Sequence, residues 1–181
     1  MDIKKLITRA LSGLIYVAVI VGCVLWGDPG ITLLGIAFAI LAGLELRNIF
    51  KHNQSSKGQF IFSFLDILGI ALLSVTFNPR IPFIPVLLWV AVVIARFVAQ
   101  LYDKDSDPLK ELSHSMFAQI YLGLPLAAMG MAAFLFSPYL VLTVFLMLWI
   151  SDTGAYLVGS MMGKRRLIER ISPNKSWEGL F

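Results

Sequence analysis

The sequence predicts an all-α polytopic membrane protein with about six transmembrane helices and both termini in the cytoplasm. Of the 181 residues, 58% are hydrophobic and 14% are charged. Soluble domains contain about 45–50% apolar and about 25% charged residues. The apolar residues also form blocks close to the ~20 residues that a helix needs to cross a bilayer. The third observation, the sidedness of Lys and Arg, sets the orientation.

The apolar blocks place the spans in order along the chain. The first block follows a basic start and is too long for the core of a cleavable signal peptide, so we expect it to remain as an anchor. The breaks between blocks are rich in the turn formers Gly, Pro, Asn, Asp and Ser. The third span is interrupted by Asp66, and the fifth by Gly123 and Pro125. The expected spans are 10–27, 31–48, 59–77, 81–102, 115–136 and 139–162, which make a transmembrane domain over 1–162 and leave a cytoplasmic segment over 163–181.

Basic residues gather on one side of these alternating spans. That side holds 13 of the 15 Lys and Arg residues. Loops rich in Lys and Arg stay in the cytoplasm, so both termini are expected there. The net charge of +4 is thereby explained by membrane orientation, and we expect membrane lipids but no nucleic acid as partners. We place the protein in the inner (cytoplasmic) membrane of the cell. The single cysteine, Cys23, leaves the redox compartment undetermined.

Four ionisable residues inside the expected spans are candidates for a functional role, namely Glu45, Asp66, Arg96 and Asp152. Burying each of these charges in a bilayer costs at least a few kcal/mol, so each needs a structural or functional explanation. In the predicted topology all four lie toward the cytoplasmic ends of their spans. One interpretation is structural, with Asp66 paired to Arg96 as packing. The other is a water-filled cavity open to the cytoplasm. The sequence leaves both open.

The last span carries a line of small residues and an acid. Ser151, Ala155, Gly159 and Gly163 recur every four residues, so they share one helix face. Such a face lets another backbone approach closely, either within the chain or in a homodimer. Asp152 lies between two hydroxyl residues near the cytoplasmic mouth. This arrangement favours a metal- or phosphate-binding element.

Basic and helix-starting residues follow the span. Ser172 before Pro173 predicts a helix N-terminus, whose free N–H groups and dipole attract phosphate. Lys175 and Ser176 would add a charge and a hydroxyl donor. The basic run 164–166 either anchors the span at anionic headgroups or joins the site. The residues therefore predict a cytoplasm-facing site for a phosphate-bearing ligand, without the GxxxxGK[ST] pattern of a P-loop.

The stretch from 151 to 179 resembles the phosphatidate cytidylyltransferase (CDP-diacylglycerol synthase) family. The matching residues are Ser151-Asp152-Thr153-Gly154-Ala155-Tyr156, Gly159, Gly163-Lys164 and Ser172-Pro173-Asn174-Lys175-Ser176-Trp177-Glu178-Gly179. Gly43-Leu44-Glu45-Leu46 is a weaker likeness. The resemblance implies the reaction CTP + phosphatidate → CDP-diacylglycerol + pyrophosphate, with Mg²⁺ as cofactor.

The resemblance also implies roles for these residues. Asp152 and Lys175 would be catalytic, and Asp152 would touch the metal. Asp66 and Arg96 would be supporting polar groups within the spans. The residues that would bind substrate or phosphate, or shape their pocket, are Ser151, Lys164, Ser172, Asn174, Ser176, Trp177 and Glu178.

One feature departs from the family. Its members continue into a second motif with acidic residues, where the family places most metal ligands, whereas this chain ends at Phe181. We therefore expect the chain to correspond to the N-terminal two-thirds of the enzyme. The alternatives are a CTP-dependent polyprenol or phytol kinase, and a non-catalytic membrane subunit or transporter. A transporter would distribute its polar residues across the membrane depth, which this sequence does not.

Overall fold

The computed structural model describes residues 3–50, 59–76, 78, 83–163, 165–168 and 172–180. The chain divides into two compact units, Met1–Val141 and Leu142–Phe181. The first unit is helical. It contains α1 (Ile3–Leu25), α2 (Asp28–Phe50), α3 (Gln59–Ser74), α4 (Ile84–Leu101), α5 (Pro108–Ala118), a π-helical turn η1 (Gln119–Gly123) and α6 (Leu124–Leu135). Helix α7 (Pro138–Met162) continues into the second unit, which also holds β1 (Arg166–Ile168) and β2 (Ser172–Ser176).

The helices confirm an all-α polytopic membrane protein. Within the described part of the chain, four helical segments are long and apolar enough to cross a bilayer: Asp28–Phe50, Ile84–Leu101, Pro108–Leu135 and Pro138–Met162. Two shorter apolar stretches, Leu11–Leu25 and Phe60–Ser74, lie in α1 and α3. Many large apolar side chains on these helices are exposed, as expected where lipid takes the place of a protein core.

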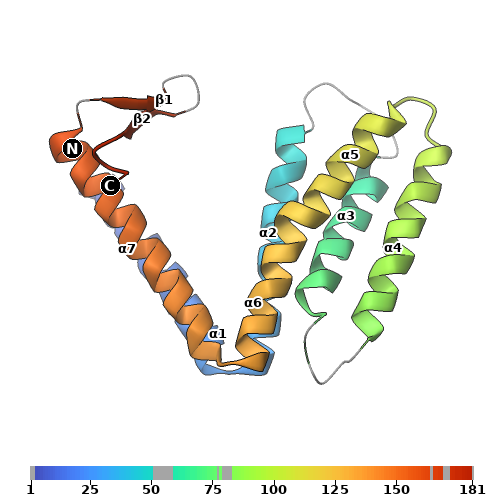
Figure 1. Ribbon diagram of the computed structural model, residues 1–181, viewed down its shortest axis with the longest axis horizontal. Helices are drawn as coiled ribbons and strands as arrows, with labels where there is room; N and C mark the ends of the chain where they lie inside the picture. The colour runs from blue at the N-terminus through green and yellow to red at the C-terminus, as the bar shows by residue number, and fades with distance from the viewer. Residues whose placement is uncertain are drawn as a thin grey trace. The chain divides into compact units, whose positions relative to one another are not determined.

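Small residues let the helices of the first unit pack closely. Helix α3 lies between α2 and α4, and α6 packs against α2 and α3 (Figure 1). Ala39 of α2, Ile70 of α3 and Ala118 of α5 form a buried cluster. A Cβ placed on Gly43 of α2 would lie 2.7 Å from Ile67 Cγ1 of α3. Side chains this small allow close backbone approach, which is how membrane helices gain packing contacts.

The helix that holds the fifth expected span begins before residue 115. Helix α5 begins at Pro108, because the Asp107 side chain caps it by accepting hydrogen bonds from the N–H groups of Leu109 and Lys110. Helix α1 likewise begins at Ile3, before the first expected span. The π-helical turn ends at Gly123, two residues before Pro125. Proline lacks an N–H and crowds the carbonyl four residues before it, and a π turn is one way that a helix accommodates such a break.

The prediction that a helix starts at Ser172 is wrong. Residues 172–176 form strand β2, which pairs antiparallel with β1 in the register Arg166↔Ser176 and Ile168↔Ser172, with an irregularity between these pairs. The Ser-Pro pattern is a local signal, and pairing with β1 overrides it. Proline is tolerated in such a strand because both strands of a two-stranded ribbon have a free edge. A helix N-terminus at Ser172 therefore does not contribute a dipole to the predicted phosphate site.

Candidate functional site

Helix α7 presents its polar motif in the second unit. Ser151 and Asp152 lie about ten residues before the end of the helix, so they are about 15 Å below it at 1.5 Å per residue. Both residues are exposed. The helix is otherwise apolar enough to span a bilayer. Asp152 thus lies within an apolar helix that is long enough to span a bilayer, on an exposed surface of α7.

An open pocket of about 810 Å³ lies between α7 and the β1–β2 hairpin with the turn that follows it. Its lining is amphiphilic. Apolar side chains come from both sides, including Ile150 and Val158 of α7, Leu167 of β1 and Leu180. The polar lining residues are Ser151, Asp152, Tyr156, Ser160, Ser172, Lys175 and Ser176. A pocket with this lining suits a ligand that carries both a phosphate and an apolar portion.

The structure brings five of the predicted site residues to this pocket. Asp152 and Lys175, the predicted catalytic pair, both line it, although they stand 23 positions apart in the sequence. Ser151, Ser172 and Ser176 line it as well. The apolar lining residues Leu167 and Leu180 were not predicted. No signal in the sequence marks them, because the hairpin that brings them to α7 was expected to be a helix.

Trp177 and Glu178 lie in the turn beside the pocket rather than in its lining. Trp177 is 47% exposed. The Glu178 carboxylate accepts hydrogen bonds from the backbone N–H of Arg165, with both oxygens 3.3 Å from the nitrogen. Glu178 thus joins the turn after β2 to Arg165, the residue directly before β1. Lys164 and the side chain of Asn174 are outside the described residues.

The donor set of the pocket bears on the expected Mg²⁺. Among the described residues, no group of three or more His, Cys, Asp or Glu side chains could hold a metal ion. Mg²⁺ is commonly bound by one or two carboxylates together with substrate phosphates and water. Asp152 supplies the carboxylate in the pocket lining. These residues therefore fit an ion held by Asp152 and, for the most part, by phosphate.

The other two predicted polar residues meet in the first unit. The Arg96 Nε atom lies 3.4 Å from Asp66 Oδ1, and the two side chains are 2% and 22% exposed. Ser115 donates a hydrogen bond of 2.5 Å to the same carboxylate oxygen. Arg96 also donates to Gln100 Oε1 at 2.8 Å and lies over the Phe62 ring, 4.2 Å from its centroid. The pairing interpretation of these two charges is thus the one that the geometry supports.

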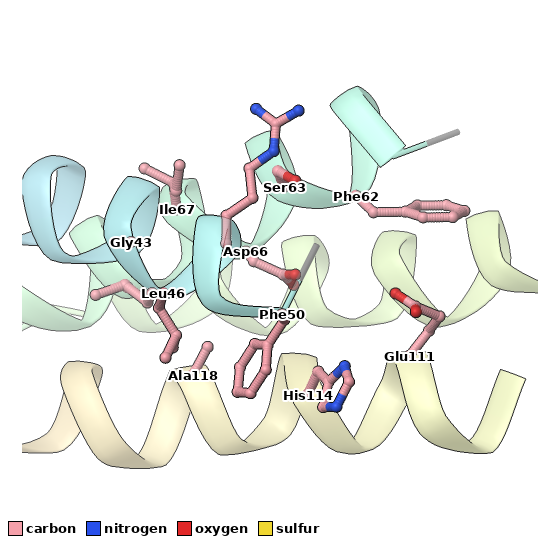
Figure 2. Close-up of a pocket in the computed structure, with 12 residues that line it drawn as sticks. Gly43, Leu46, Phe50, Phe62, Ser63, Asp66, Ile67, Glu111, His114 and Ala118 are labelled. Atoms are coloured by element: carbon pink, nitrogen blue, oxygen red, sulfur yellow. The ribbon is translucent and has the colours of Figure 1, made fainter. Parts of the chain in front are cut away.

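Asp66 also faces a small pocket of about 60 Å³ in this unit. Figure 2 shows Asp66, Glu111, Phe50 and His114 around it, with the Phe50 and His114 rings side by side. The two rings are stacked, with centroids 4.1 Å apart. Glu45 does not line it. The pocket is large enough for a few water molecules, so the Asp66 carboxylate can stay hydrated in the middle of α3.

Comparison with known proteins shows the family to which the chain belongs. The profile of the Cytidylyltransferase family matches residues 7–181, which is nearly the whole chain. The chain belongs to this family. No solved structure matches the chain.

Curated relatives match a shorter stretch. A phosphatidate cytidylyltransferase from Haemophilus influenzae is 50% identical over 42 residues, which are 23% of this chain and 15% of the relative. One from Staphylococcus aureus is 59% identical over 39 residues (22% and 15%), and one from Staphylococcus epidermidis is 54% identical over 41 residues (23% and 16%). The matched segment thus covers a small part of each relative. The family profile, in contrast, matches nearly the whole chain.

Proposed function

We propose that this chain acts in phospholipid biosynthesis as a phosphatidate cytidylyltransferase, converting CTP and phosphatidate to CDP-diacylglycerol and pyrophosphate. The observation that carries the proposal is the amphiphilic pocket that Asp152 of α7 and Lys175 of β2 both line. The membership of the Cytidylyltransferase family and the names of the relatives, all phosphatidate cytidylyltransferases, support the same reaction.

The reaction joins two anionic substrates. A phosphate oxygen of phosphatidate attacks the α-phosphorus of CTP, a new P–O–P bond forms, and the bond from the α-phosphorus to the oxygen that bridges it to the β-phosphorus breaks as pyrophosphate leaves. Such a transfer needs alignment of the groups and compensation of charge more than covalent help from the protein. Lys175 would compensate phosphate charge, and the hydroxyls of Ser151 and Ser172 would donate to phosphate oxygens. The apolar lining would hold the lipid portion.

Mg²⁺ belongs to this proposal as the expected cofactor. When bound, it would offset the charge of the approaching phosphates. Asp152 would hold it, because a carboxylate is the hard oxygen ligand that Mg²⁺ prefers. Lys164, Asn174 and Trp177 keep the phosphate-binding or pocket-shaping roles that the resemblance implies.

We further propose that the site faces the cytoplasm in the inner membrane of the cell, where CTP is present. The asymmetry of Lys and Arg supports this orientation. A homodimer receives no support from the small-residue face of α7, because Gly159 and Gly163 on that face contact residues of the same chain.

The test uses CTP labelled at either the α- or the γ-phosphate, supplied with phosphatidate and Mg²⁺ to membranes that contain the chain. A cytidylyltransferase transfers the α label to lipid and releases the γ label as pyrophosphate, whereas a CTP-dependent kinase transfers the γ label. The assay is run on the chain alone and on the chain joined to the C-terminal part of the Haemophilus influenzae relative. Transfer of the α label supports the proposal, and no lipid label from either protein contradicts it.

Substitutions tie the activity to the pocket. We expect Asp152→Asn and Lys175→Ala each to lower kcat about 10²-fold or more, as losing a group that stabilises transition-state charge does. Lys175→Arg should retain more activity than Lys175→Ala because it keeps the charge. Asp105→Asn and Lys104→Ala are matched controls, because both residues are exposed in the loop between α4 and α5. Equal effects in the control and pocket variants would contradict the assigned roles.

A further inference from the structure

The turn after β2 is seated on the small-residue face of α7. A Cβ placed on Gly179 would lie 2.7 Å from the Ala155 carbonyl oxygen and 3.1 Å from Gly159 Cα. A Cβ on Gly159 would lie 3.3 Å from Ser176 Oγ. A side chain at position 179 does not fit against the α7 backbone without a shift, and one at position 159 would press against the Ser176 hydroxyl. The line of small residues that the sequence shows on α7 is therefore occupied by the chain's own residues 176–179.

Hydrogen bonds hold the same turn from the other side. The backbone N–H of Trp177 donates to the Arg165 carbonyl at 3.0 Å, and the Glu178 carboxylate accepts from the Arg165 N–H. Ser176 is 8% exposed, and its Oγ accepts from the Gly179 N–H at 3.3 Å. The Ser176 hydroxyl therefore already has a partner within the protein, and its side chain is packed against α7.

These contacts lie directly next to Lys175, the proposed catalytic lysine. Lys175 is exposed, lines the pocket and directly precedes Ser176. On the helix side, Ala155 and Gly159 lie one and two turns beyond Ser151 and line the same pocket. Anchoring residues 176–179 on this face sets how far Lys175 stands from Asp152. Looser anchoring would widen that separation.

We propose that Ser176, Glu178 and Gly179 form a clasp (these three residues with their contacts on α7 and Arg165) that positions Lys175 over the Asp152 face of α7. They act as positioning residues and not as phosphate ligands. This inference rests on the proposed function for its catalytic consequence. The clasp itself rests on the packing alone.

Four variants of the full chain test the clasp. Gly179→Ala forces a Cβ against the α7 backbone, and Glu178→Ala removes the acceptor for the Arg165 N–H. Glu178→Gln keeps an acceptor oxygen without the charge. Gly22→Ala is the matched control, because a Cβ on this α1 glycine meets nothing within 4 Å.

The first readout is independent of catalysis. Trypsin should cleave after Arg165, Arg166 and Lys175 faster when this region opens locally, so a change in the cleavage rate of the chain in detergent micelles reports the clasp. We expect Gly179→Ala and Glu178→Ala to speed cleavage about tenfold, as expected when a local opening equilibrium shifts. Glu178→Gln should restore most of the protection. Cleavage at the control rate in Gly179→Ala overturns the proposal.

The second readout separates positioning from binding. In CDP-diacylglycerol formation, Gly179→Ala and Glu178→Ala should lower kcat, by up to about 10²-fold, because small misplacements of a catalytic group cost that much. Ser176→Ala should lower kcat modestly while the KM for CTP stays unchanged. A raised KM for CTP in Ser176→Ala, or full loss of activity in Glu178→Gln, would identify direct ligands and overturn the proposal. Faster cleavage with unchanged kcat would overturn positioning. If the wild-type protein makes no product, the proposed function fails, while the trypsin rates still decide whether the clasp exists.

Discussion

Arg96 brings a full charge into the helical bundle of the first unit. It is 2% exposed, yet Asp66, Gln100 and the Phe62 ring all contact its guanidinium. The Asp66 carboxylate also accepts a hydrogen bond from Ser115. Gln119 donates to the Asp66 carbonyl oxygen at 3.0 Å and accepts from Trp89 Nε1 at 3.1 Å. This network joins α3, α4, α5 and the π turn through polar contacts, which cost little only while every member keeps its partner.

Breaking the ion pair should therefore destabilise the fold. We expect Asp66→Asn to cost about 3 kcal/mol, because it leaves a buried guanidinium without its counter-charge. The double variant Asp66→Asn/Arg96→Gln should cost less than the sum of the single variants, with a coupling of about 0.5–3 kcal/mol. Thermal unfolding in detergent micelles measures the stability of Asp66→Asn, Arg96→Gln and the double variant, with Asp105→Asn as the exposed control. Additive losses would show that the two residues do not act as a pair.

At this scale, part of the network could be predicted from the sequence. Asp66 and Arg96 fall at similar depths in neighbouring spans, so pairing was one of two readings. Ser115 and Gln119 could not be assigned as partners of Asp66, because they stand 49 and 53 positions away. Which face of α5 meets α3 depends on the π turn and on helix packing, neither of which an apolar block encodes. The same holds for Asp152 and Lys175, which were predicted singly from their motifs.

Glycines set the distance between the helices of the first unit. At Gly43 the ideal Cβ position is 2.7 Å from Ile67 Cγ1, and at Gly69 it is 2.7 Å from Gln119 Nε2. Gly13 of α1, in contrast, has nothing within 4 Å of its Cβ position. Only some helical glycines are therefore required by packing.

This difference predicts opposite results for the same substitution. Gly43→Ala should lower the free energy of unfolding by about 1–3 kcal/mol, as overpacking of a filled interface does. Adding Ile67→Ala should recover part of that loss. Gly13→Ala should not destabilise, because alanine favours the helix by up to about 1 kcal/mol. Thermal unfolding in detergent gives the comparison. A Gly43→Ala protein as stable as Gly13→Ala would show that α2 and α3 are not in close contact.

The elements themselves were predictable to different degrees. Long apolar blocks identify helices in a membrane because no other open structure satisfies the backbone there. The segment after α7 has no such constraint. There Ser172-Pro173 looks like a helix start, but residues 172–176 gain more partners by pairing with β1 and by packing Ser176 on Gly159. Pairing of this kind depends on a partner strand and a helix face that local sequence rules do not consider.

The distribution of basic residues over the whole chain bears on its orientation in the membrane. In the first unit, the end of α2, the start of α3, the end of α4 and the start of α5 lie at one end of the bundle (Figure 1). Arg47, Lys104 and Lys110 belong to these ends. The connection between α1 and α2, at Trp26–Gly27, carries no Lys or Arg. This sidedness favours one orientation over its inverse.

Reporter fusions test the orientation along the full chain. Green fluorescent protein, which fluoresces in the cytoplasm, should be fluorescent after Phe181 and when placed before Met1. Alkaline phosphatase, which is active only outside the cytoplasm, should be active after Asp28, Asn78 and Ser137 and inactive after Phe50 and Asp105. The reason is electrostatic, since translocating a loop rich in Lys and Arg is disfavoured. The reverse pattern would place Lys175 on the side without CTP, and it would contradict the proposed site as well as the topology. The length and apolar composition of α4 predict that it spans the membrane. Active phosphatase after both Asn78 and Asp105 would contradict that prediction.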